Sequence, residues 1–73
     1  MPIDVRLSEP RLIDELIAAF IRTGYLVHRL DDASCRVAYM KPTTPAQAEK
    51  ELQFFVRAWQ LEHPGVLAFV SAG

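Results

Sequence analysis

Arg6, His28 and Arg36 carry the side chains of this chain that are best suited to binding an anion. A guanidinium group can hold a phosphate or carboxylate through two parallel hydrogen bonds, and an imidazole gains a charge near neutral pH. The alternative is a solvated sheet surface, on which a cross-strand pair such as Asp4 with Arg36 adds roughly a few tenths of a kcal/mol. Interspersed charges on a sheet more often have this second role.

Cys35 is the single thiol of the chain, and His28 and His63 are the two imidazoles that could activate it. Alternation along a strand places Cys35 and His28 on opposite faces, and His63 lies at the far end of a predicted helix. We therefore interpret Cys35 as a small buried apolar residue. Two histidines without H-x-x-x-H or C-x-x-C spacing predict no metal site, and no motif indicates a cofactor. No catalytic residue is assigned, and the sequence argues against an enzyme without settling the question.

A third candidate site is an apolar stripe formed by Phe54, Ala58 and Leu61, at positions i, i+4 and i+7 of a predicted helix. Arg57 borders this stripe. Because a helix that lies on a sheet needs only one apolar face, a second stripe with a large aromatic residue favours an interface with another protein or a second copy. Single exposed apolar residues are also common, and a neighbouring helix could cover the stripe.

The helix that carries this stripe is predicted over residues 44–63. Thr44 is the expected N-cap, Pro45 occupies the first helical position, and Gln47 completes a capping box. His63-Pro64-Gly65 ends the helix. The residues expected to face the core recur at helical spacing: Ala48, Leu52, Phe55, Val56 and Trp59.

An earlier helix is predicted over about residues 9–23, with Ser8 as its N-cap and Gly24 as a left-handed C-cap. Its expected apolar face is Leu12, Ile13, Leu16, Ile17, Phe20 and Ile21. Four strands are predicted over residues 3–7, 25–30, 35–40 and 66–70, with a turn at residues 31–34. The predicted fold is therefore α+β, a ferredoxin-like βαββαβ sandwich: a four-stranded antiparallel sheet in the order 4-1-3-2, with both helices on one face.

This topology determines which side chains share the open face of the sheet. If Val27, Val37 and Tyr39 face the helices, His28 and Arg36 lie on the open face, beside Asp4 and Arg6 of the first strand. Three apolar positions make this face a second candidate surface for association: Leu26, Met40, and either Leu67 or Phe69.

Size and composition limit the function further. The 73 residues suit a single domain, residues 1–73, and the apolar content of 51% suits good packing or self-association. A net charge of −1 without basic clusters argues against nucleic-acid or membrane-surface binding. The first residues lack a signal-peptide pattern, and one cysteine suits a reducing cytoplasm.

We therefore expect a small non-enzymatic interaction or regulatory domain, cytoplasmic, that forms a homodimer or binds another protein. The expected interface is Phe54, Arg57, Ala58 and Leu61, or the open sheet face. The alternative function is a module that binds a small ligand or anion through Arg6, His28 and Arg36.

Overall fold

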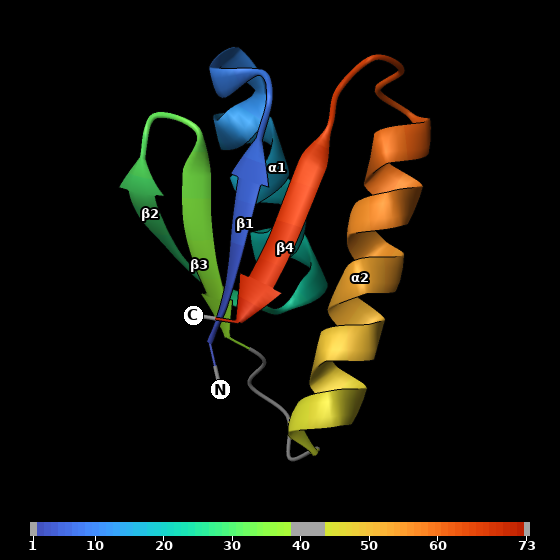
Figure 1. Cartoon of the computed structure of the whole chain (residues 1–73). Helices are drawn as coiled ribbons and strands as arrows, with labels where there is room; N and C mark the ends of the chain where they lie inside the picture. The colour runs from blue at the N-terminus through green and yellow to red at the C-terminus, as the bar shows by residue number, and fades with distance from the viewer. Residues whose placement is uncertain (1, 39–43, 73) are drawn as a thin grey trace.

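The computed structural model describes residues 2–38 and 44–72. Its elements follow the chain in the order strand, helix, strand, strand, helix, strand (Figure 1). They are β1 (Ile3–Leu7), a 3-10 turn (Pro10–Leu12), α1 (Ile13–Thr23), β2 (Leu26–Asp31), β3 (Ser34–Ala38), α2 (Pro45–Leu61) and β4 (Ala68–Ala72).

The four strands form one antiparallel sheet with the order β2-β3-β1-β4, so that β4 and β2 are its edges. Read from the β4 edge, the neighbours are β4, β1, β3 and β2. An α+β class with one four-stranded antiparallel sheet and two helices is thus confirmed. In Figure 1, α1 lies behind the sheet and α2 lies beside β4, beyond the edge of the sheet.

One hydrophobic core joins both helices to the sheet. Val5 of β1 and Val37 of β3 are buried with Leu16 and Phe20 of α1 and with Leu52 of α2. The alternation predicted for β1 is confirmed, because Ile3, Val5 and Leu7 are all buried.

Three aromatic rings connect the two helices. Phe20 stacks on Phe55 of α2 with ring centroids 4.8 Å apart, and Tyr25 meets Phe20 edge-on at 5.5 Å. Such pairs add to the stability gained from burial alone, and here they fix α2 against α1.

The start of the first helix differs from the prediction. Ser8 is not its N-cap: the Ser8 hydroxyl accepts a hydrogen bond from the Leu67 backbone N–H at 2.9 Å and ties the end of β1 to the start of β4. The chain enters the helix through the 3-10 turn, and Leu12, the N-cap of α1, makes no side-chain capping bond. The Ser8 backbone N–H also donates to the Leu67 carbonyl at 2.8 Å, so Ser8 continues the pairing of the two strands by one residue instead of starting the helix.

The buried stripe of α1 is narrower than predicted. Ile13, Leu16 and Phe20 face the sheet, but Ile21 is exposed and Ala19 is buried in its place. Successive helical residues are 100° apart, so Ile21 lies outside the stripe that Phe20 centres on. Gly24 is the expected left-handed C-cap, with φ of 104°.

Thr44 is the N-cap of α2, as predicted, and its hydroxyl accepts a hydrogen bond from the Gln47 N–H at 3.2 Å. The end of α2 is not as predicted, because the helix stops at Leu61 and His63 lies outside it. Asp31 and Ser34 belong to β2 and β3 rather than to the turn between them.

The last strand starts two residues later than predicted, although Val66 is still buried. The predictions for Tyr39 and Met40 lie outside the described residues.

Candidate functional site

Among the residues that the structure describes, the two large apolar side chains with the highest exposed fractions lie on the outer face of α2. Phe54 is 69% exposed and Leu61 is 78% exposed, and Ala58 between them is also exposed. Leu52 and Val56 on the opposite side of the same helix are buried. The stripe predicted from the sequence therefore points into solvent, and α1 does not cover it.

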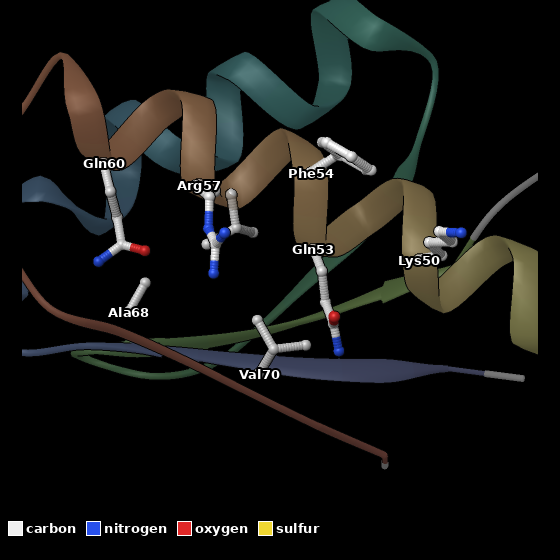
Figure 2. Close-up of a pocket in the computed structure, with 8 residues that line it drawn as sticks. Lys50, Gln53, Phe54, Arg57, Gln60, Ala68 and Val70 are labelled. Atoms are coloured by element: carbon white, nitrogen blue, oxygen red, sulfur yellow. The ribbon is translucent and has the colours of Figure 1, made fainter.

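A groove of about 360 Å³ runs along one side of this face, between α2 and β4 (Figure 2). Gln53, Arg57 and Gln60 extend from the helix toward the strand, and Ala68 and Val70 extend from the strand toward the helix. On the helix side the lining thus consists of amide and cationic side chains together with Phe54 and Val56, and on the strand side it is a small apolar floor.

The groove exists because the strand side of it carries only the short side chains of Ala68 and Val70. The bulkiest core residues of α2, Leu52 and Trp59, are buried, whereas Ala68 and Val70 of β4 are only partly covered. At one end the Gln60 side-chain amide donates a hydrogen bond to the Val66 carbonyl at 3.2 Å.

Sequence reasoning assigned Arg57 and Phe54 to an interface but missed the groove. The local pattern shows only that Gln53 and Gln60 lie seven residues apart on the side of α2 that also carries Val56, which predicts a polar flank of the helix but not a groove.

The open face of the sheet carries a bidentate ion pair between Arg36 and Asp4. Arg36 Nε donates to Asp4 Oδ1 at 2.8 Å, and Nη2 donates to Oδ2 at 3.2 Å. The two residues are direct partners across β1 and β3, as the predicted register required. This hydrogen bonding lowers the pKa of Asp4 and raises the pKa of Arg36.

Arg6 has a carboxylate partner that the sequence analysis did not identify. Arg6 Nη2 donates to Asp31 Oδ2 at 3.1 Å, and the Ala33 N–H donates to Asp31 Oδ1 at 2.9 Å. The pKa of Asp31 is lowered first by the hydrogen bond from Ala33, then by one from Ser34, and also by the charge of Arg6. Beside this pair lies a hollow of about 280 Å³, lined by Asp4, Arg6, Asp31 and four uncharged residues.

The three predicted anion-binding residues are on one face, but they do not converge as free cations. His28 lies opposite Arg36 across β2 and β3, and Arg6 lies two residues along β1 from Asp4. Both guanidinium groups already bind a carboxylate, so an added anion must compete with Asp4 or Asp31. Exposed apolar residues of this face lie on the two edge strands, Leu26 and Leu30 on β2 and Phe69 on β4, with the charges of β1 and β3 between them.

Cys35 is fully buried on the helix side of β3, away from His28. Burial raises the pKa of its thiol to about 11, which disfavours the reactive thiolate at neutral pH.

His63 is occupied elsewhere: its Nδ1–H donates to the Trp59 carbonyl at 2.8 Å, and its ring stacks on the Trp59 indole. This hydrogen bond, followed by Glu15 and Glu62, raises the pKa of His63.

No cluster of three or more potential metal ligands is present within residues 2–38 and 44–72. Neither helix of this described part has both the length and the apolar character that a membrane crossing requires.

Comparison with known proteins gives no match: no family model fits the chain, and no curated protein or solved structure is significantly similar to it.

Proposed function

We propose that residues 1–73 form a single ferredoxin-like domain, a cytoplasmic interaction or regulatory module that self-associates through the outer face of α2. The observation that carries this proposal is the exposure of Phe54 and Leu61, 69% and 78%, on one side of one helix. Large apolar groups that remain in water lose the free energy that burial would supply, and a second copy can supply the cover.

The outer face of α2 is better suited to this role than the open sheet face. Phe54, Ala58 and Leu61 follow one another along the helix without a charged residue within the stripe. On the sheet, the ion pair of Arg36 with Asp4 lies between the two exposed apolar edges, and its burial against a partner would cost desolvation energy.

The two surfaces can be compared by matched substitutions of exposed residues. Phe54→Glu and Leu61→Glu alter the outer face of α2, whereas Leu26→Glu and Phe69→Glu alter the open sheet face. Light scattering over a range of concentrations gives the molar mass of each folded variant.

We expect the parent to be a dimer or a larger assembly, and only the α2 variants to have a smaller molar mass. A smaller molar mass in the sheet variants alone would show that the interface is the open sheet face. A monomeric parent at high concentration would refute self-association.

An anion-binding function through Arg6, His28 and Arg36 is the less supported alternative, because both arginines are already neutralised by carboxylates.

A further inference from the structure

We propose that the groove between α2 and β4 binds an extended peptide segment, which adds to the sheet as a fifth strand and carries carboxylates that meet Lys50 and Arg57. This inference names a partner class for the interaction module proposed above and in that sense rests on it. The groove, however, differs from the stripe of Phe54, Ala58 and Leu61, because only Phe54 of these three residues lines it.

The two edges of the sheet differ in how well they are protected against pairing. The β2 edge contains His28, Arg29 and Asp31, and its register is broken by an irregularity between Arg29 and Asp31. Charges and bulges are the usual means by which proteins prevent a further strand from pairing. The β4 edge has no charged residue, no proline and no irregularity in its register with β1. No feature of β4 itself therefore prevents pairing, and although α2 lies beside this edge, the groove leaves space between the helix and the strand, so a further strand can add here.

The backbone of β4 directs hydrogen-bonding groups out of the sheet. The Ser8 N–H donates to the Leu67 carbonyl at 2.8 Å, so the paired groups of Leu67 point toward β1. Because these groups alternate sides along an antiparallel strand, the N–H and C=O of Ala68 and Val70 point away from β1. An added strand can pair with both residues.

The same two residues form the floor of the groove, and α2 lies beyond the edge strand on that side (Figures 1 and 2). A fifth strand would therefore place every second side chain between β4 and α2. There it would meet Val56 and Val70, which are apolar, and Gln53, whose amide can both donate and accept a hydrogen bond.

The charges of the groove indicate what the partner carries. Lys50 and Arg57 line it, and none of its lining residues is acidic. In the described part of the chain, no carboxylate forms an ion pair with either cation. They are seven positions apart on the helix, roughly 10.5 Å along its axis, while side chains on one face of a strand repeat about every 6.6 Å. Acidic residues two positions before and after a central apolar residue fall within reach of the two long side chains.

A second copy of the chain is the less suitable occupant. Its own β4, Ala68–Ala72, carries no carboxylate, and pairing two β4 edges would bring Lys50 and Arg57 of both copies to one seam. Like charges in close proximity oppose such pairing.

The test is a titration of the isotope-labelled parent chain with acetyl-Thr-Glu-Thr-Val-Thr-Glu-Thr-amide, followed by NMR and amide hydrogen exchange. A matched peptide with lysine in place of both glutamates is the control. We expect chemical-shift changes and slowed exchange at the Ala68 and Val70 amides with the glutamate peptide, and a weaker effect with the lysine peptide.

Three variants separate the contribution of the groove charges to peptide binding from that of backbone pairing with β4. The double change Lys50→Glu and Arg57→Glu should weaken binding of the glutamate peptide about tenfold and reverse the preference between the peptides. Arg22→Glu, an exposed charge reversal on α1, should change neither the affinity for the glutamate peptide nor the preference between the two peptides. Ala68→Pro removes one outward N–H at the first residue of the strand, where proline is tolerated, and should abolish binding.

The absence of any change at Ala68 and Val70 at millimolar peptide would refute the proposal, as would binding that is indifferent to the charge reversal. Protection of these amides that rises with protein concentration alone would assign the edge to a second copy instead. Leu61→Glu distinguishes the two proposals, because it should abolish self-association and leave peptide binding intact.

Discussion

Leu52 and Leu61 lie on opposite sides of α2, so the same substitution at each residue tests how the helix is oriented. Leu52 is 1% exposed, and Leu52→Ala leaves a cavity among core residues of α1, α2 and the sheet. Loss of a buried leucine side chain costs about 2–5 kcal/mol in unfolding free energy. For 73 residues the total stability is about 4–11 kcal/mol, so this variant should be severely destabilised or unfolded.

Leu61 is 78% exposed, so only about a fifth of its surface is covered within one chain. Full burial of a leucine is worth about 1.5–3 kcal/mol, and Leu61→Ala should therefore cost about 0.3–0.6 kcal/mol in the isolated chain. If the outer face of α2 is an interface, the same substitution has a second effect that depends on concentration, since association stabilises the folded state by mass action.

Urea denaturation at two protein concentrations measures both effects. The parent midpoint should rise with concentration, the Leu61→Ala midpoint should rise less, and at the lower concentration the two should nearly coincide. A loss above about 1.5 kcal/mol for Leu61→Ala at the lower concentration would refute the orientation of α2, because it exceeds what the covered fraction can supply. A mild effect of Leu52→Ala would refute it equally.

Two further predictions concern titrating side chains. With a thiol pKa of about 11, only about a thousandth of Cys35 is thiolate at pH 8. A colourimetric thiol reagent should therefore react slowly with the folded chain and rapidly with the chain unfolded in urea. Rapid reaction in buffer without urea would contradict the burial of Cys35. The pKa of His63 is raised on folding, so its contribution to stability is complete below the unfolded pKa near 6.5 and is lost as the pH rises through the folded pKa. The difference in unfolding free energy between the parent and His63→Gln should accordingly be larger at pH 5.5 than at pH 8.5. A reversed trend would mean that the hydrogen bond to Trp59 and the charges of Glu15 and Glu62 do not favour the protonated ring.

The sequence by itself determined the local features of this protein. Thr44 before Pro45 specifies the start of α2, and Gly24 specifies the end of α1, because caps depend on residues within one turn of one another. Alternation along Ile3–Leu7 specified the buried face of β1. The outward direction of Phe54 and Leu61 also followed from helical spacing within one segment.

Only the tertiary structure decided which groups from distant segments meet. Ser8 is of a residue type that often caps helices, but its hydroxyl accepts a hydrogen bond from the N–H of Leu67, 59 residues later and directly before β4. Arg6 forms an ion pair with Asp31 of the same chain, because β3 brings the end of β2 close to β1.

The groove likewise depends on where α2 lies relative to the β4 edge, which no local pattern specifies. Side-chain periodicity identifies the face that an element buries. The space that remains between two elements is set by their offset, and that offset results from packing of the whole core.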